Sequence, residues 1–166
     1  MDADALKQLQ TPIKDAYRRD PSAALITLKA SGWIDEQNIA CKVETGRALA
    51  IAGLHPATGG SGAELCSGDM LLEALVACAG VTLKAVATAL DFRLDKARVS
   101  AEGDLDFRGT LGVSKDAPVG FSAIRLSFDL DTNEPEERIA TLVRLTERYC
   151  VVFQTLNTRP ALSVSY

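Results

Sequence analysis

The sequence has a single histidine, no pair of cysteines in CxxC spacing and no excess of basic residues. With one imidazole and four scattered thiols, the chain does not have the ligand pattern of a zinc site, and no metal is expected. The formal charge is −4 and the charges are interspersed, so there is no basic patch of the kind that neutralises phosphates. We therefore do not expect nucleic acid as a partner.

A linker rich in proline, glycine and serine is also missing, which predicts one domain over residues 1–166, with residues 1–20 as an N-terminal helical arm. The first residues lack the basic-then-apolar order of a secretory signal, so we expect a cytoplasmic protein with reduced thiols. In that compartment the cysteines are expected to be core residues, metal ligands or reactive thiols in preference to structural disulfides. They are Cys41, Cys66, Cys78 and Cys150.

The longest helical pattern runs from Ser67 to Asp91. At about 100° per residue its charged residues fall within a narrow wedge, so the rest of its surface is apolar and is expected to be buried. Lys84 interrupts the apolar run short of the roughly 20 residues that a bilayer requires, which favours a core helix and no membrane partner. Cys78 lies about 140° around the helix from Glu73, so its sulfur is expected to point inward.

The residues before this helix predict an arm and a small antiparallel sheet. Helical spacing over residues 3–18 is interrupted by Pro12, which indicates a broken helix. Strands are expected over 24–30, 39–44 and 49–52, with a turn over 31–38. Cys41 then faces the core. Glycine and proline recur over 53–66, so this segment is expected to be a loop, and Ser67 caps the helix that follows.

The residues after the helix predict a hairpin, a second helix and a last strand. Residues 97–108 alternate, with Val99, Ala101, Leu105 and Phe107 on the inner face, and 122–130 alternate likewise. A helix is expected to begin with Asn133 as its cap and to end at 158–160. Leu142, Thr146 and Cys150 share one face of that helix, so Cys150 also points at the core. Residues 162–166 alternate as a terminal strand.

Two cysteine segments carry a resemblance to a known family. Gly68-Asp-Met-Leu-Leu-Glu-Ala-Leu-Val-Ala-Cys78-Ala and Glu147-Arg-Tyr-Cys150-Val-Val-Phe-Gln-Thr-Leu156 resemble the first and second cysteine segments of the OsmC/Ohr superfamily. The resemblance implies an α+β fold with antiparallel sheets around two core helices, in an intertwined homodimer. It also implies reduction of hydroperoxides, with Cys78 attacking the peroxide and Cys150 resolving the sulfenic acid into a disulfide.

The thiolate of such an enzyme must be stabilised, because burial of Cys78 alone would raise its pKa. We therefore expect a cation beside Cys78. Active relatives use an arginine from the strand region, held by a glutamate just ahead of the cysteine helix, and Gly68 occupies the expected position of that glutamate. The supporting residues that remain as candidates by their chemistry are Arg47, His55, Glu64 and Asp69.

Two functions follow. The first is a cytoplasmic thiol peroxidase that needs a hydroperoxide and a dithiol reductant but no cofactor. The second is a non-catalytic protein of the same fold that binds a small apolar ligand at the dimer interface. Cys66 is a rival nucleophile, since its place before a helix N-terminus favours its thiolate.

The apolar residues predict both the assembly and the substrate. The central helix is apolar over more of its circumference than one small sheet can cover, and the arm is free to clasp a second subunit, so an obligate dimer is expected. Organic hydroperoxides are expected to react better than hydrogen peroxide, because apolar side chains surround the two thiols. These side chains are Leu75, Val76, Leu83, Val152 and Phe153.

Overall fold

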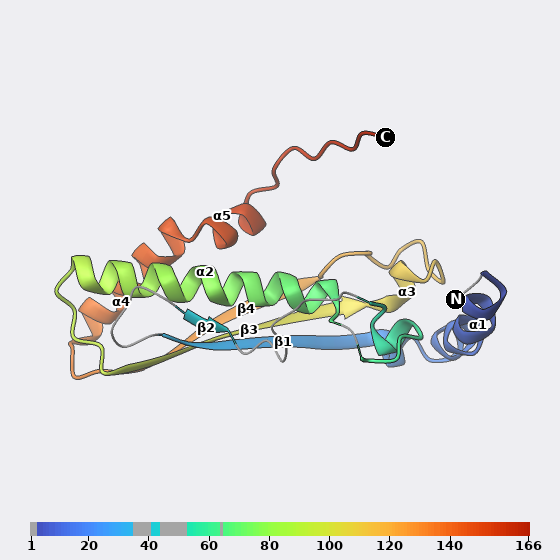
Figure 1. The fold of residues 1–166 in the computed structure, drawn as a ribbon, viewed down its shortest axis with the longest axis horizontal. Helices are drawn as coiled ribbons and strands as arrows, with labels where there is room; N and C mark the ends of the chain where they lie inside the picture. The colour runs from blue at the N-terminus through green and yellow to red at the C-terminus, as the bar shows by residue number, and fades with distance from the viewer. Residues whose placement is uncertain (1–2, 35–40, 44–52, 64) are drawn as a thin grey trace. The chain divides into compact units, whose positions relative to one another are not determined.

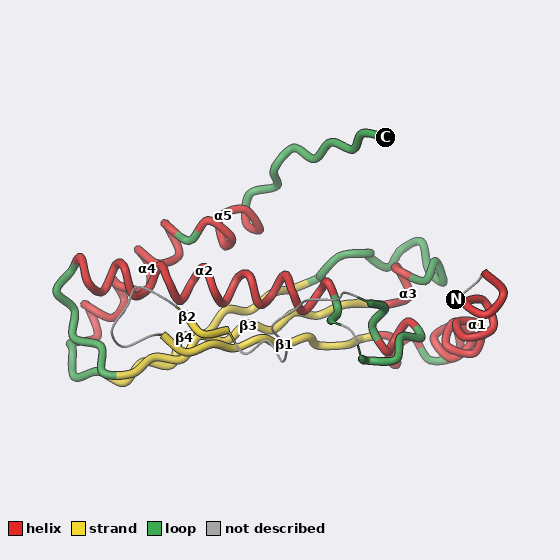
Figure 2. The backbone as a smooth tube through the Cα atoms, viewed as in Figure 1, coloured by secondary structure: helices red, strands yellow, loops and turns green. Residues whose placement is uncertain are grey.

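The computed structural model describes residues 3–34, 41–43, 53–63 and 65–166, and within these ranges the chain is an α+β protein (Figures 1 and 2). Its elements are α1 Ala3–Arg19, η1 Pro21–Ala24, β1 Leu25–Ile34, β2 Cys41–Val43, η2 Pro56–Thr58, α2 Ser67–Ala89, β3 Lys96–Asp106, α3 Phe107–Thr110, β4 Ala123–Asp131, α4 Glu136–Tyr149 and α5 Val151–Asn157. The chain forms two compact units. The first contains residues 1–30, 45–72 and 101–125, and the second contains 31–44, 73–100 and 126–166.

The strands form a four-stranded sheet in the order β2-β1-β3-β4. β1 and β2 are antiparallel, with Gly32 opposite Val43 and Ile34 opposite Cys41. β3 shows the alternation that the sequence predicted as far as Leu105, because its inner residues are buried and the outer ones up to Asp104 are not. Asp106 is buried as well, and the strand ends there instead of at residue 108, because α3 begins at Phe107. Val99 is fully buried and Leu105 is 8% exposed. The predicted turn over 31–38 is wrong for residues 31–34, which belong to β1, and residues 35–38 lie outside the described part of the chain.

In the first unit, helix α1 packs on the loop that contains η2. The Tyr17 hydroxyl donates to the carbonyl of Ala57 at 2.7 Å, and the Gln10 amide donates to the carbonyl of Thr58 at 3.3 Å. The predicted break at Pro12 does not occur, and the helix continues through it. The proline removes only one backbone donor, and the two tertiary hydrogen bonds hold the helix on both sides of it.

Helix α2 is a core helix. Its length and composition alone would allow it to cross a membrane, but six of its apolar side chains are buried inside the protein. The interpretation as a core helix, made from the position of Lys84, agrees with this burial. The buried apolar side chains of α2 are Leu72 in the first unit and Leu75, Val76, Ala79, Leu83 and Ala87 in the second.

The end of α2 is a Schellman motif. Phe92 N–H donates to the carbonyl of Ala87 at 2.8 Å, and Asp91 N–H donates to that of Thr88 at 3.2 Å. Asp91 has a φ of 47°, the left-handed conformation that this motif requires. The helix therefore ends at Ala89, before the Asp91 that the sequence pattern included.

The second-cysteine segment is two helices instead of one. α4 ends at Tyr149, Cys150 is extended with φ −72° and ψ 107°, and α5 begins at Val151. Leu142 and Cys150 are fully buried, so the predicted inward face is present although the helix is interrupted. Its start also differs from the prediction, because the N-cap is Pro135.

Residues 158–166 form neither helix nor strand, so the predicted terminal strand is wrong for the isolated chain. Leu162 and Val164 are 89% and 97% exposed. Alternation makes a segment suitable for a sheet, but a strand forms only where another strand edge is available. The predicted strand over 49–52 lies outside the described residues, and so does the side chain of Cys41.

Candidate active site

The second unit brings Cys78 and Cys150 together. Cys78 lies on α2 and is half-buried, whereas Cys150 lies between α4 and α5 and is fully buried. The two side chains form a hydrogen bond with each other. Both cysteines are free thiols.

The pKa of the Cys78 thiol is lowered from its ordinary value. Burial is the largest single influence and acts in the opposite direction, but hydrogen bonds to the sulfur outweigh it. They come from the backbone N–H groups of Val152 and Val151, the thiol of Cys150 and the hydroxyl of Thr82. Among the described residues, the groups that favour the Cys78 thiolate are therefore neutral donors, where the sequence analysis expected a cation.

Burial and the neighbouring Cys78 thiolate raise the pKa of Cys150 to about 11. Cys150 therefore keeps its proton when Cys78 has lost its own, and it donates that proton into the hydrogen bond. The geometry places a nucleophilic thiolate beside a protonated thiol. This arrangement is suited to thiol oxidation followed by disulfide formation.

The break in the helix at Cys150 makes this arrangement possible. Within a continuous helix the N–H groups of Val151 and Val152 would be bonded to carbonyls one turn earlier. Because α5 begins anew at Val151, neither group has a carbonyl one turn earlier, and both are left to lower the pKa of the Cys78 thiol. Thr82 follows Cys78 by four residues on α2, so its hydroxyl reaches the same sulfur from the next turn.

The sequence pattern did not indicate the donors at Val151, Val152 and Thr82. The helical spacing of apolar residues continues unchanged across Cys150, so it gave no sign of the break. The hydroxyl of Thr82 had a detectable signal, because a residue four positions from a helical cysteine lies on the same face.

Of the four residues predicted to support Cys78, two belong to the first unit, and two lie outside the residues that the structure describes. His55 and Asp69 belong to the first unit, where burial raises the pKa of Asp69 and nearby His55 partly offsets the rise. Cys66 lies in the same unit and is half-buried. Arg47 and Glu64 are outside the described residues.

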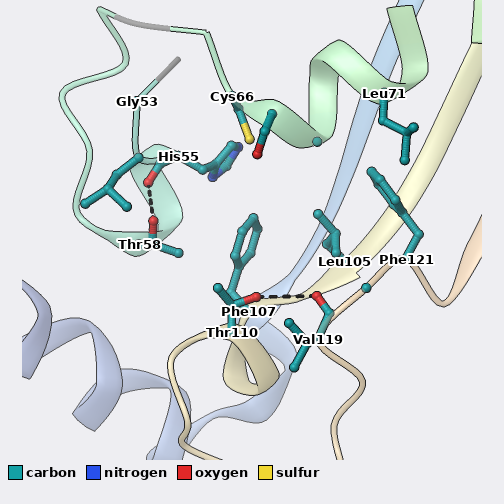
Figure 3. A pocket seen from close by; sticks show the side chains of 14 residues that line it. Gly53, His55, Thr58, Cys66, Leu71, Leu105, Phe107, Thr110, Val119 and Phe121 are labelled. Atoms are coloured by element: carbon teal, nitrogen blue, oxygen red, sulfur yellow. Dashed lines mark hydrogen bonds between the residues drawn. The ribbon is translucent and has the colours of Figure 1, made fainter. Parts of the chain in front are cut away.

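His55 and Cys66 line a pocket of about 430 Å³ in the first unit (Figure 3). The imidazole stacks on the ring of Phe107, with 4.8 Å between centroids and 18° between planes. Its Nδ1 accepts a hydrogen bond from Ala57 N–H at 3.0 Å. The other lining residues are Gly53, Leu54, Thr58, Ser67, Gly68, Leu71, Leu105, Thr110, Val119, Gly120 and Phe121.

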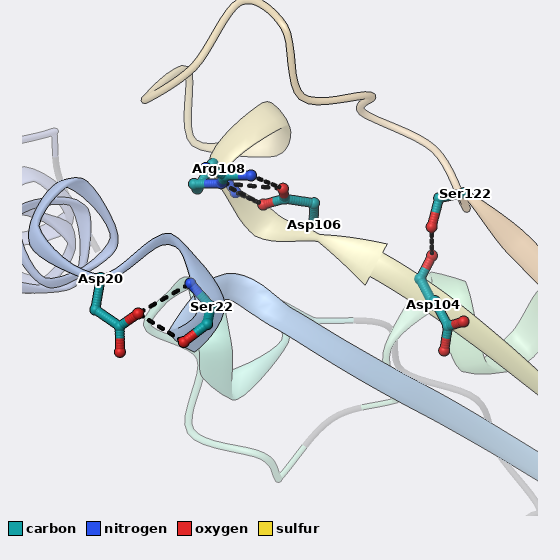
Figure 4. A network of polar contacts seen from close by, with 6 residues as sticks. All are labelled: Asp20, Ser22, Asp104, Asp106, Arg108 and Ser122. Atoms are coloured by element: carbon teal, nitrogen blue, oxygen red, sulfur yellow. Dashed lines mark hydrogen bonds and ion pairs between the residues drawn. The ribbon is translucent and has the colours of Figure 1, made fainter.

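A polar network fixes the wall of this pocket at Phe107 (Figure 4). Asp106 is 5% exposed and accepts from the Arg108 backbone N–H at 3.0 Å, which begins α3. The Arg108 guanidinium binds the same carboxylate and lowers the pKa of Asp106. A charged pair thus holds the turn that buries Phe107, which is 4% exposed.

No cluster of three histidine, cysteine, aspartate or glutamate side chains that could hold a metal ion occurs within the described parts of the chain. The functional geometry that the structure does contain is a contacting pair of thiols on an α+β scaffold.

A pair of neighbouring thiols on an α+β scaffold defines a class of proteins with two-cysteine sites. A family model described as OsmC-like protein matches residues 60–165, a range that includes both thiols, and the chain belongs to this family. The family that the sequence resembled is thereby confirmed.

Comparison with solved structures supports the fold. The crystal structure of an OsmC-like hydroperoxide resistance protein from Jannaschia sp. CCS1 is 18% identical, with a TM-score of 0.59. The match covers 84% of this chain and 91% of that one. Comparison with curated proteins gave no match.

Proposed function

We propose that the protein is a cysteine-based thiol peroxidase that reduces organic hydroperoxides, with Cys78 attacking and Cys150 resolving. The observation that supports this most is the pairing of two free thiols, Cys78 half-buried and Cys150 fully buried, with the pKa lowered at Cys78 and raised at Cys150. Membership of the OsmC-like family and the likeness to a hydroperoxide resistance protein are consistent with it.

In the first step the Cys78 thiolate attacks the outer oxygen of the hydroperoxide. The O–O bond breaks, an S–O bond forms, and the alkoxide leaves as the alcohol after it takes a proton from water. Cys78 becomes a sulfenic acid. The thiolate is available because the N–H groups of Val151 and Val152 stabilise its charge.

In the second step the Cys150 sulfur attacks the sulfenic sulfur of Cys78. The S–O bond breaks, a disulfide forms, and the Cys150 proton leaves with the hydroxyl group as water. An external dithiol then reduces the disulfide by exchange and is itself oxidised to a disulfide. The cycle consumes one hydroperoxide and one dithiol, and its chemistry requires no further cofactor.

The surroundings of the thiols support an apolar substrate. Val152 and Phe153 are half-buried at the start of α5, beside the N–H groups that contact Cys78. Leu75, Val76 and Leu83 are at most 1% exposed, so they pack in the core and leave substrate contact to the α5 residues. Organic hydroperoxides should therefore react faster than hydrogen peroxide.

The working unit in this proposal is a homodimer in the cytoplasm, each chain a single domain with residues 1–20 as an arm. Large apolar side chains of the second unit are left at the surface, as expected of a subunit interface. Val151 is 70% exposed and Tyr149 is 57% exposed. Sedimentation velocity at micromolar concentration tests the dimer, and a folded monomer would exclude it.

Thiol counting tests the peroxidase. The reduced protein is treated with one equivalent of cumene hydroperoxide, denatured and titrated with a thiol reagent. A peroxidase loses two of the four thiols per chain, and peptide mapping finds a Cys78–Cys150 disulfide. The alternative, a ligand-binding protein without turnover, retains all four.

A further inference from the structure

The pocket of the first unit has the size and lining of a small-molecule site that is distinct from the thiol pair. Its volume of about 430 Å³ lies within the roughly 300–1,000 Å³ typical of such sites. One wall is apolar, and the imidazole of His55 and the sulfur of Cys66 lie together at the other side (Figure 3).

The local backbone determines which nitrogen of the His55 imidazole carries the proton. Because Nδ1 accepts the Ala57 N–H, the neutral ring has its proton on Nε2. The carbonyl of His55 accepts from Thr58 N–H at 2.8 Å and from Gly60 N–H at 3.1 Å, so the ring is held on a fixed turn. Nε2–H is then an oriented donor at the edge of the pocket.

The lining of the pocket also offers apolar surface that this chain leaves uncovered. Leu71 is 38% exposed, Leu54 44% and Val119 66%, and all three line the pocket. The Phe121 ring lies against β3 at Gly103, where a Cβ would be 2.4 Å from the ring. A ligand that covered these side chains would gain the free energy of burying apolar area.

The charges nearby select against an anionic ligand. Among the described residues that line the pocket, none is a lysine or an arginine. Asp69 interacts electrostatically with His55, so a negative charge brought to the imidazole would also be repelled. An anion would lose its hydration without gaining a cationic partner.

From this geometry we propose that the pocket binds an uncharged, mainly apolar molecule with one hydrogen-bond acceptor, such as a ketone or an ester, which accepts from His55 Nε2–H. This site lies in the first unit and uses neither Cys78 nor Cys150. The proposed ligand site does not depend on the proposed peroxidase activity, so an experiment that excludes one of the two proposals does not exclude the other.

The thiol of Cys66 reports occupancy, because it lines the pocket. The rate of its modification by N-ethylmaleimide is measured by peptide mass spectrometry on the full chain, with 2-acetonaphthone as the probe. At about ten times its Kd the ketone should slow the reaction of Cys66 about tenfold. The rate at Cys78, in the other unit, serves as the internal control.

Two analogues test the chemical class. 2-Ethylnaphthalene has a similar shape without the acceptor, and 2-naphthoate has the acceptor with a negative charge. 2-Ethylnaphthalene should require about tenfold higher concentration for the same protection, the difference that one hydrogen bond of about 1.4 kcal/mol makes. 2-Naphthoate should also bind more weakly than the ketone, because its charge loses hydration and finds no cationic partner among the described lining residues. His55→Asn retains an acceptor for Ala57 N–H and removes the imidazole, so the preference for the ketone over the hydrocarbon should disappear.

A matched pair of variants tests the location. Leu71→Glu places a charge on the apolar wall and should abolish protection. Leu90→Glu makes the same change at a similarly exposed position, 36% against 38%, that does not line the pocket, and it should retain protection. If Leu71→Glu does not fold, Val119→Glu on the exposed loop replaces it.

Three results would overturn the proposal. They are no protection of Cys66 by the ketone up to its solubility limit, equal protection by the ketone and by 2-naphthoate, and undiminished protection in a folded Leu71→Glu or Val119→Glu protein.

Discussion

The Cys150 thiol donates a hydrogen bond to the sulfur of Cys78, and this contact moves the two pKa values in opposite directions. The proton of the pair is therefore retained by the fully buried sulfur, and the negative charge is carried by the half-buried one. If Cys78 is the thiolate and Cys150 the protonated thiol, the two residues should differ in their reactivity, which can be measured for each thiol separately.

Alkylation by iodoacetamide should separate the two thiols by pH. The modification of Cys78 should reach half its maximal rate below the ordinary thiol pKa of 9.0, whereas Cys150 should stay protonated until about pH 11. Site-resolved mass spectrometry between pH 5 and pH 11 measures both profiles. Equal profiles would show that the thiols are not coupled.

Substitutions of Cys150 should distinguish its two roles. Cys150→Ser retains a donor to Cys78, so the thiolate persists and one equivalent of peroxide should leave a sulfenic acid trappable by dimedone. Cys150→Ala removes the donor, so the pKa of Cys78 should rise and its reaction with peroxide at neutral pH should slow. Cys78→Ser should abolish peroxide consumption, and retained activity would instead point to Cys66.

Thr82→Val should raise the pKa of Cys78 while the shape of the side chain is preserved, because it removes one of the hydrogen bonds to the sulfur. The expected slowing of the peroxide reaction at neutral pH is about tenfold, in keeping with about 1.5 kcal/mol for a hydrogen bond to a charged group. Thr88→Val is the control, since the Thr88 hydroxyl bonds to the Lys84 carbonyl of its own helix at 2.8 Å.

Gly60→Ala should destabilise the loop that carries His55. A Cβ at residue 60 would lie 1.6 Å from the carbonyl oxygen of Leu54, and this neighbour is backbone that cannot turn aside. A loss of about 2 kcal/mol in the free energy of unfolding is expected from such overpacking. Gly120→Ala, where a Cβ meets no atom of the described structure within 4 Å, should be close to neutral in the same urea titration.

Acid stability should depend on Asp104. Arg125 and Thr27 bind its carboxylate and lower its pKa from 3.8 to about 2. The folded state thus binds this proton less tightly than the unfolded state, so the stabilisation is present above pH 3.8 and is lost as the pH falls toward 2. Urea unfolding of Asp104→Asn should show a lower stability at pH 7 and a weaker decline between pH 4 and pH 2. A slope identical to that of the wild type would contradict the assignment.

The periodicity of apolar residues was sufficient to predict those helices and strands that bury one face. The alternation around Val99 and Ala101 predicted β3, and the apolar circumference around Leu75 predicted a core helix. The pairing of Cys78 with Cys150 followed from the family resemblance, because spacing along a chain says little about distance between separate elements. A break in a helix is also invisible to periodicity when the inward residues continue in phase across it, as they do from Leu142 to Cys150.

The tertiary contacts of single polar side chains were the hardest feature to predict from the sequence. His55 followed by Pro56 indicated a loop residue, and the structure does place it at the start of a turn. Its stacking on Phe107 joins residues from distant parts of the sequence, so local pattern contained no sign of it. The same holds for Asp104, whose partner Arg125 comes from the next strand.

The start of α5 at Val151 makes two amide protons into reporters of the redox state. In the reduced protein the N–H groups of Val151 and Val152 bond to a negatively charged sulfur, which shifts their NMR resonances and protects them from exchange with solvent. A sulfur that has entered a disulfide carries no charge and is a much weaker acceptor. The amide resonances of these two residues should therefore report whether the thiol pair is reduced or oxidised, and a nitrogen-15 spectrum would follow oxidation by an added hydroperoxide without any label on the cysteines.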